Sequence, residues 1–352
     1  MDRSRHAETG SSGSDERASV SGVGGYRPAW WNRSRHLQTV WNRLLRRAIY
    51  VPTTRARWTT PDGDFLDLDF MDGPVASPRL LVIHGLEGSS NRRYVRGLLA
   101  LAAEHGWRGV AMNFRSCSGT PNRTARLYHS GDTGDLGWVI GELAKREPGA
   151  PILPVGVSLG GNVLLKWLGE EGEGAADEVR AAVAISTPFD LAAAAERMSR
   201  GAGRLYSYFF LRTLKAKALQ KADENPDLLD AGAIRRARTW RQYDDAATAP
   251  LHGFKDAEDY WAQSSSIFYL DRIRRPVLLI NARNDPFLPP SSLPEEQVER
   301  SEWLHAEFTA GGGHAGFVAG ALPWQPYYWS EHRAIGYLSG FVPTIRPARS
   351  SR

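Results

Sequence analysis

The chain has 352 residues, 42% of them hydrophobic and 24% charged, and its formal net charge is +5. This length allows one large α/β domain with an insertion, or two domains. No apolar run approaches the roughly 18 residues of a membrane-spanning helix, and the N-terminus lacks the apolar core of a secretory signal. The single cysteine, Cys117, excludes an internal disulfide, so we expect a cytoplasmic protein in a reducing compartment.

The basic excess belongs to the N-terminal segment. Residues 1–57 hold eleven arginines and four acidic residues, whereas acidic residues slightly outnumber basic ones in the rest of the chain. Since the body is nearly neutral, we expect no nucleic-acid partner. Residues 1–25 are rich in serine, glycine and charge, with almost nothing to bury, and are predicted to form a disordered tail.

A candidate helix follows within residues 36–50. Its apolar and basic side chains recur near helical spacing on opposite sides: Leu37, Val40, Trp41, Leu44 and Leu45 on one, Arg43, Arg46 and Arg47 on the other. We favour a helix that packs on the domain and leaves its arginines solvated. The alternative is a basic amphipathic helix that makes weak contact with an anionic membrane surface.

Residues 56–60 and 65–70 predict a β-hairpin across the turn at 61–64. The second arm, Phe65-Leu-Asp-Leu-Asp-Phe70, alternates apolar and acidic side chains. Alternation of this kind is typical of a strand with one solvated face, so we expect the aspartates to contact water.

Strands then alternate with helices along most of the chain. Apolar runs predict strands at 80–84, 109–113, 151–157, 181–185, 276–280 and 304–308, and helical patterns occur at about 91–105, 132–147, from the turn at Ser158 to 171, 291–300 and 327–341. This order predicts an α/β fold with a largely parallel, doubly wound sheet.

Residues 189–272 interrupt the alternation. They contain helical patterns at 205–219 and 232–243 and no clear strand, which predicts a helical cap inserted over the carboxyl edge of the sheet. The insertion carries four clustered aromatic residues, Tyr206, Tyr208, Phe209 and Phe210. These residues could line an apolar acyl pocket or form the core of the insertion, and we favour the core for most of them.

The stretch Leu153-Pro-Val-Gly-Val-Ser158-Leu-Gly-Gly-Asn162 carries the strongest functional signal. An apolar strand ends in Gly-x-Ser-x-Gly and passes directly into a predicted helix. A nucleophile elbow needs this arrangement, because the strained backbone at the serine requires small residues two positions away on either side. The five-residue pattern alone could also be a structural turn, but its strand–helix context favours Ser158 as a nucleophile.

A serine hydroxyl needs a base to remove its proton and a third group to orient that base. Asp285, in Asn281-Ala-Arg-Asn-Asp-Pro286, follows a strand and is our candidate acid. Asp190, also just after a strand, is the alternative. Either aspartate could instead be a turn residue that caps its own loop. His314, in Thr309-Ala-Gly-Gly-Gly-His314, is the candidate base, since the glycines allow a loop to bend over the sheet edge. His305 and His332 fall within a predicted strand and helix and are interpreted as packed or solvated.

The order Ser158, Asp285, His314 along the chain is the order of the α/β-hydrolase triad. The oxyanion of an acyl transfer also needs two N–H donors. We assign these to the backbone N–H groups of Leu159, which follows the serine, and of Leu86, in the loop after the strand at 80–84. His84, at the end of that strand, is expected to be a hydrogen-bonded scaffold for the loop.

No cofactor is predicted. The sequence contains no HExxH motif, no Cys/His metal spacing, no phosphate-binding glycine loop and no dinucleotide fingerprint. Cys117 lies in a loop that could approach the site, but no neighbouring residue in sequence would lower its pKa, so we interpret it as a small structural residue.

Taken together, these stretches resemble the YheT-like family of α/β-hydrolases, bacterial relatives of eukaryotic abhydrolase-domain lipid esterases. The resemblance covers about residues 26–342, with a short tail at 343–352, and is carried by Arg27-Pro28, His36-Leu-Gln-Thr39, His84-Gly-Leu-Glu-Gly-Ser89, Asn113-Phe-Arg-Ser-Cys-Ser-Gly119, Tyr128-His-Ser-Gly-Asp132, Gly156-Val-Ser-Leu-Gly-Gly-Asn162, Asn281–Pro286 and Gly313-His-Ala-Gly-Phe317. The family usually has glycine at the position of Ser116, a small change that we do not expect to disturb the site.

The resemblance implies a Ser158–Asp285–His314 charge relay and hydrolysis of carboxylic esters with short or medium acyl groups. The expected partner is a small ester or a lipid. Two alternatives stay open: a non-catalytic scaffold that binds a ligand or protein, and an acyltransferase that uses the same triad. The sequence does not fix the natural substrate or the oligomeric state.

Overall fold

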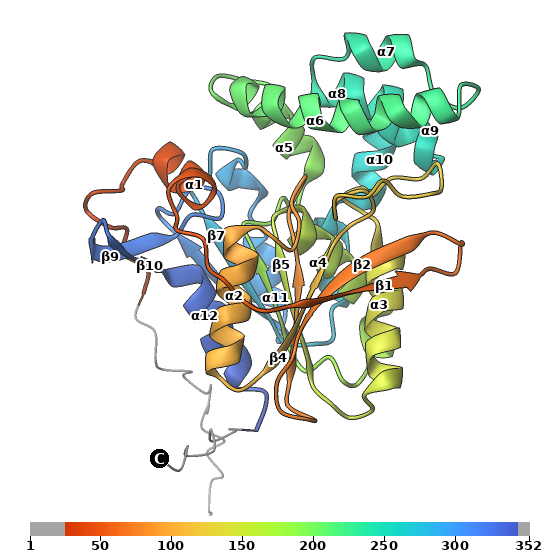
Figure 1. The fold of residues 1–352 in the computed structure, drawn as a ribbon. Coiled ribbons are helices and arrows are strands. Elements are labelled where there is room, and N and C mark those ends of the chain that lie inside the picture. Colours follow the sequence, from red (N-terminus) through yellow and green to blue (C-terminus); the bar gives the residue numbers. More distant parts are fainter. Residues whose placement is uncertain (1–24, 344–352) are drawn as a thin grey trace, which may run out of the picture.

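The computed structural model describes residues 25–343. The predicted tails at 1–25 and 343–352 therefore lie outside the described residues, apart from residues 25 and 343. The described part is built on a single eight-stranded sheet with helices on both faces and a group of helices above one edge (Figure 1).

The sheet has the strand order β1-β2-β4-β3-β5-β6-β7-β8. Its strands are β1 (Thr54–Thr59), β2 (Phe65–Met71), β3 (Arg79–Ile83), β4 (Arg108–Met112), β5 (Ile152–Val157), β6 (Ala182–Ile185), β7 (Val277–Ala282) and β8 (Leu304–Thr309). Neighbouring strands from β4 to β8 pair in parallel, and only β1 and β2 pair antiparallel to their neighbours. The predicted α/β fold with a mostly parallel sheet is confirmed.

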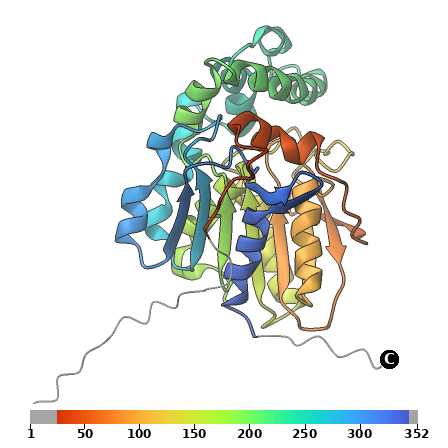
Figure 2. The ribbon, with the colours of Figure 1, turned by 90° about the vertical axis from the view of Figure 1, so that its left-hand side faces the viewer.

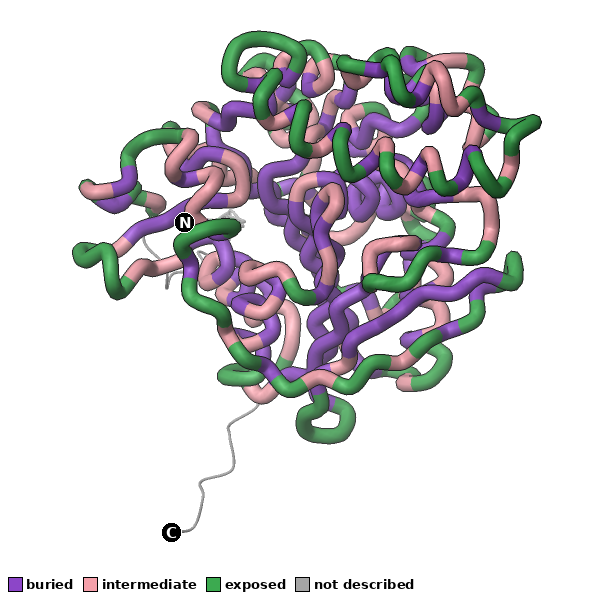
Figure 3. Tube along the Cα trace, turned by 45° about the horizontal axis from the view of Figure 1, so that its top comes forward, coloured by how far each residue is buried: buried purple, intermediate pink, exposed green. Residues whose placement is uncertain are grey.

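The sheet is covered on both faces, which is why every residue of β3 to β7 is buried (Figure 3). One hydrophobic cluster joins it to α2 (Arg93–Glu104) and α12 (Trp329–Ser339). A second cluster joins the other face to α3 (Thr133–Arg146) and α4 (Leu159–Glu171), next to α11 (Glu295–Arg300). Figure 2 shows the helices on the two sides of the sheet.

The hairpin forms as predicted, but its acidic face is buried rather than solvated. Asp67 and Asp69 of β2 are almost completely inaccessible. The register places them opposite Arg57 and Arg55 of β1, and each aspartate accepts two hydrogen bonds of 2.8–2.9 Å from its arginine. The expectation of a wet face was wrong because the cross-strand arginines neutralise and cover the carboxylates.

Helices alone connect β6 to β7, and they lie above the carboxyl ends of the parallel strands (Figures 1 and 2). The α-helices among them are α5 (Leu191–Met198), α6 (Gly203–Glu224), α7 (Ala231–Arg236), α8 (Trp240–Tyr243), α9 (Ala249–His252) and α10 (Ala257–Ser264). The single helical pattern at 232–243 is divided between α7 and α8. The chain leaves α7 at Ala237, and Thr239 begins α8 by accepting the N–H of Gln242 with its hydroxyl. We call this group of helices the cap.

The N-terminal helix, α1 (Arg35–Leu44), packs on the domain in an unexpected orientation. It buries the polar residues Gln38 and Asn42 and exposes Leu44 and the following Leu45. The prediction that the arginines of this helix are solvated is wrong for one of them. Arg46 is buried and forms a two-pronged ion pair with Glu331 of α12.

A short second sheet was not predicted from the sequence. In it, β9 (Val318–Leu322) pairs antiparallel with β10 (Gln325–Tyr328), which falls partly within the helix predicted at 327–341. Among residues 25–343, none of the helices combines the length and hydropathy needed to cross a bilayer.

The Arg46–Glu331 pair predicts a large difference between two adjacent arginines. Arg46→Ala should lower the free energy of unfolding by about 3–5 kcal/mol, because it leaves the Glu331 carboxylate buried without a partner. Arg47→Ala, at an exposed position, should change it by less than about 0.5 kcal/mol. Urea denaturation of both variants measures the difference, and equal stabilities would show that the ion pair is not a structural link.

Candidate active site

Ser158 is the one residue between β5 and α4. Its backbone has φ 55° and ψ −121°, a conformation that a residue with a side chain adopts only under strain. The turn is possible because its neighbours lack side chains: a Cβ on Gly156 would collide with the carbonyl of Gly160, and one on Gly160 would collide with the carbonyl of Ile83. The serine hydroxyl is thereby fixed at the carboxyl edge of the sheet.

The structure brings the three predicted triad residues together. Nε2 of His314 lies 2.8 Å from Oγ of Ser158, and Nδ1 of His314 lies 2.8 Å from Oδ2 of Asp285. A carboxylate can only accept, so Nδ1 carries the proton and Nε2 is free to accept the serine hydrogen. This tautomer is the one that a general base requires.

Asp285 is held rigidly in the loop after β7. Its side chain is completely buried, and its second oxygen, Oδ1, accepts the N–H of Phe287 at 2.8 Å. The ring of Phe287 packs against that of His314, with centroids 4.4 Å apart. The imidazole is therefore oriented by a hydrogen bond at its edge and by an aromatic contact on its face.

The alternative acid and bases lie elsewhere. Asp190 caps α5 by accepting the N–H of Ala193 at 2.9 Å. His305 lies on the edge strand β8 and His332 stacks on Tyr327. None of the three forms a hydrogen bond with the triad or lines the cavity around it.

The polar face of α1 anchors the loop that carries His314. The hydroxyl of Thr39 accepts the N–H of His314 at 2.9 Å, and the Gln38 amide bonds both the N–H and the carbonyl of Val318, at 2.7 and 3.0 Å. Asn42 donates to the carbonyl of Ala315. Sequence reasoning missed these positioning residues; their placement on one helical face, at i, i+1 and i+4, was the available signal.

The two candidate oxyanion donors flank the serine. Leu159 follows it directly at the start of α4, and a Cβ on Gly85, next to Leu86, would lie 3.0 Å from the Ser158 Cβ. Within residues 25–343 neither leucine N–H has a hydrogen-bond acceptor. Both N–H groups are therefore free to donate a hydrogen bond to an oxygen of a bound ligand.

The loop that carries Leu86 is braced by His84. Its Nδ1 donates to the carbonyl of Gly85 at 2.7 Å, and its Nε2 accepts the N–H of Phe114 at 3.2 Å. Complete burial lowers the pKa of His84 to about 3, so the ring is neutral and its two nitrogens keep these opposite roles. The scaffold that the sequence suggested is present in the structure.

A neighbouring loop contains Ser116 and Cys117. Ser116 has φ 60°, in the region that favours glycine, and its hydroxyl accepts the N–H of Asn122 at 3.0 Å. The Cys117 thiol lies 3.4 Å from Lys217 Nζ, a neighbour that the sequence could not show. Burial nevertheless raises the pKa of Cys117 to about 11, which fits an unreactive structural thiol.

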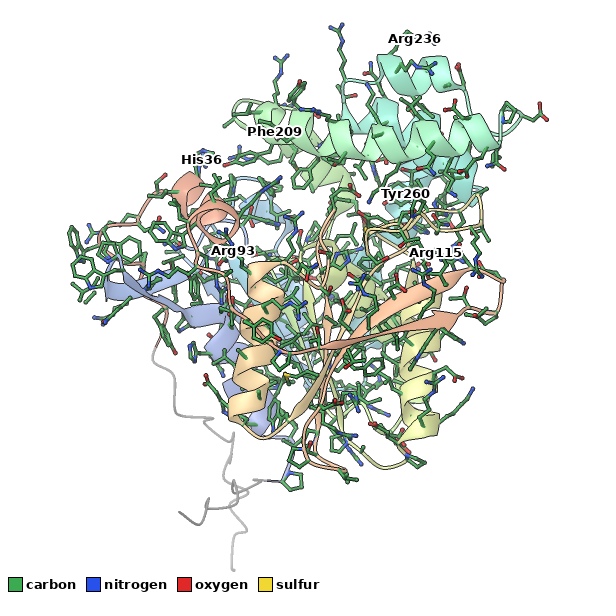
Figure 4. The ribbon with its side chains drawn as sticks, viewed as in Figure 1. His36, Arg93, Arg115, Phe209, Arg236 and Tyr260 are labelled. Carbon is green, nitrogen blue, oxygen red and sulfur yellow. The ribbon has the colours of Figure 1, made fainter. Side chains whose placement is uncertain are left out.

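A cavity of about 740 Å³ opens beside Ser158 and His314, between the body and the cap. Its wall is mainly apolar and includes Tyr206, Phe209 and Phe210 of the predicted aromatic cluster, whereas Tyr208 lies outside it. One part of the wall is polar: His129 and His252 have ring centroids 4.3 Å apart, and the buried Asp244 also lines the cavity. Tyr260 of α10, in the cap, also lines the cavity (Figure 4).

Burial sets the charge of these polar groups. It lowers the pKa of His252 to about 4 and raises that of Asp244 to about 7, so both side chains are more neutral near pH 7 than in water. Residues 25–343 contain no group of three or more His, Cys, Asp or Glu side chains placed to hold a metal ion.

Comparison with known proteins agrees with this geometry. The family model described as alpha/beta hydrolase fold matches residues 78–320. YheT of Escherichia coli, provisionally named an esterase, is 40% identical over 87% of this chain and 91% of its own. The monoacylglycerol lipase of Saccharomyces cerevisiae and the phospholipase ABHD3 of mouse are each 30% identical over 76% of this chain, and over 62% and 67% of their own chains.

A solved structure shows the same architecture. A Pyrococcus furiosus esterase superposes with a TM-score of 0.55 at 16% identity, covering 83% of this chain and 92% of that one. At this level of identity the likeness concerns the fold alone.

The geometry distinguishes the two candidate acids. Asp285→Asn should lower kcat by about three to four orders of magnitude, because an amide at this position favours the wrong tautomer of His314. Asp190→Asn should leave kcat within a few-fold, since asparagine also caps helices well. Steady-state kinetics on an ester substrate test the pair, and a larger loss in Asp190→Asn would reverse the assignment.

Proposed function

Because the chain belongs to the α/β-hydrolase fold family and to its YheT-like branch, we propose that it is a serine carboxylesterase that needs no cofactor. The observation that carries the proposal is the unbroken hydrogen-bonded series Ser158–His314–Asp285, with both distances at 2.8 Å. A non-catalytic scaffold has no need for a base in this tautomer beside a strained serine.

The chemistry follows from the positions of the groups. Oγ of Ser158 attacks the acyl carbon while Nε2 of His314 takes its proton. The carbonyl oxygen becomes an oxyanion and is stabilised by the N–H groups of Leu86 and Leu159. His314 returns the proton to the departing alcohol oxygen, and a water molecule, activated in the same way, releases the acid from the acyl-enzyme. Asp285 stabilises the imidazolium in both steps.

The cavity supports esters with an apolar acyl group as substrates. Its volume and mainly apolar wall suit an alkyl chain next to Ser158, and the neutral polar groups at His129 and His252 could bond the oxygens of an alcohol portion. The lipase and phospholipase relatives favour the same class, short- or medium-chain esters including lipid esters.

Removal of the nucleophile provides the first functional test. Ser158→Ala should lower the turnover of p-nitrophenyl esters by at least about three orders of magnitude and leave the far-ultraviolet spectrum unchanged. Ser199→Ala, a matched change at an exposed serine, should retain full activity. An unchanged rate in Ser158→Ala would overturn the proposal, and a series of acyl lengths on the wild-type protein would define the preferred chain.

A further inference from the structure

The first half of α6 is apolar on two opposite faces. Leu211 and Leu214 are buried in the cap, whereas Leu205, Tyr208 and Phe209 are each more than half exposed. A surface helix normally has one apolar face, which it buries. The outward row, at i, i+3 and i+4 spacing, stays largely exposed even though Leu205 and Phe209 reach the cavity and the rings of Tyr208 and Phe209 pack edge to face.

Helix α1 presents a second exposed apolar group. Because its polar side chains Gln38 and Asn42 face the protein, the apolar Leu44 and Leu45 face outward, and both are more than half exposed. The helix is amphipathic, as the sequence predicts, but the apolar residues at its C-terminal end face the solvent.

Helices α1 and α6, which carry these two groups, lie side by side at the opening of the cavity. His36 of α1 and Tyr206 of α6 are hydrogen-bonded at 3.2 Å with their rings stacked, and Figure 4 shows His36 and Phe209 close together on the two helices. Leu44, Leu205 and Phe209 line the cavity although they are largely exposed, which places them at its mouth. We call the exposed residues Leu44, Leu45, Leu205, Tyr208 and Phe209 the mouth face.

The segments that carry the mouth face are basic. Residues 26–61 and 197–222, which include α1 and most of α6, contain no acidic residue. The exposed arginines of these segments include Arg43, Arg47, Arg204 and Arg212. None of the four forms an ion pair with a carboxylate within the described part of the chain.

We propose that the mouth face docks on an anionic lipid bilayer and presents the cavity opening to it. Exposed leucine, tyrosine and phenylalanine can enter the boundary between head groups and acyl chains, while the surrounding arginines bind anionic head groups. A substrate drawn from the bilayer could then reach Ser158 without crossing water.

Charge argues against the other occupants of this surface. In a symmetric dimer the mouth faces of two copies would meet, and their arginines would repel one another. The N-terminal residues 1–24 contain three arginines and four acidic residues and few large apolar side chains, so they could cover little of the apolar surface. Docking on lipid also goes beyond the proposed function, because it does not depend on ester hydrolysis.

Vesicle co-sedimentation tests the proposal with the full chain carrying Ser158→Ala, so that no lipid is hydrolysed. The chain should sediment with vesicles of phosphatidylcholine and phosphatidylglycerol, much less with phosphatidylcholine alone, and less as salt is added. Leu45→Ser/Tyr208→Ser and Arg47→Glu/Arg212→Glu alter residues outside the cavity wall, and each pair should weaken binding about tenfold or more. With Ser158 restored, both should hydrolyse a water-soluble ester at the wild-type rate.

Two matched pairs serve as controls. Val75→Ser/Phe268→Ser removes apolar side chains that are at least as exposed, and Arg180→Glu/Arg272→Glu reverses exposed arginines at the amino ends of the strands, opposite the cap. Both should bind like the parent. The proposal is overturned if the parent chain ignores anionic vesicles, if the controls lose as much binding as the mouth-face variants, or if the parent is a dimer that Leu45→Ser/Tyr208→Ser converts to monomers without any vesicle binding.

Discussion

The strained turn at Ser158 is the constraint on which the rest of the site depends. A residue with a side chain at positive φ costs about 1–3 kcal/mol, and the close contacts of Gly156 and Gly160 with neighbouring carbonyls show how tightly the sheet and α4 enforce it. Of the seven non-glycine residues with positive φ among residues 25–343, five lie in loops around the site: Glu87, Ser158, Ser186, Ala315 and Phe317. The buried parallel sheet supplies the rigidity that keeps these conformations in place.

The proposed catalytic base, His314, depends on a segment that precedes the hydrolase core. The loop carrying His314 contains several glycines, which leave it with little conformational preference of its own. Helix α1 supplies the missing order through Thr39, Gln38 and Asn42, and the buried Arg46–Glu331 pair ties the end of that helix to α12. The same packing turns the apolar end of α1 outward to the mouth of the cavity. One helix thus joins the geometry of the triad to the surface that we propose for lipid contact.

The sequence predicted those features that depend on neighbouring residues. The central strands are continuous apolar runs, so their positions could be inferred within one or two residues, and the triad candidates could be chosen because each follows a strand whose carboxyl end must lie at one edge. Features decided by distant partners could not be inferred. Asp67 and Asp69 are buried because arginines of β1 lie opposite them. Arg46 is buried because it pairs with Glu331, which is 285 residues away along the chain. Helix α1 turns its polar face inward because the loop near residue 314 offers hydrogen-bond partners. The oxyanion role of Leu86 and Leu159 and the cytoplasmic location stay predictions.

The most direct measurement is a crystal structure of the protein after reaction with a fluorophosphonate ester, which loses fluoride to an activated serine. We expect a single phosphorus–oxygen bond to Oγ of Ser158, with the phosphoryl oxygen about 2.7–3.1 Å from the backbone nitrogens of Leu86 and Leu159. His314 should remain bonded to Asp285. An unreacted Ser158, a label on a different serine, or a phosphoryl oxygen directed away from both nitrogens would contradict the assignment of this site to ester hydrolysis.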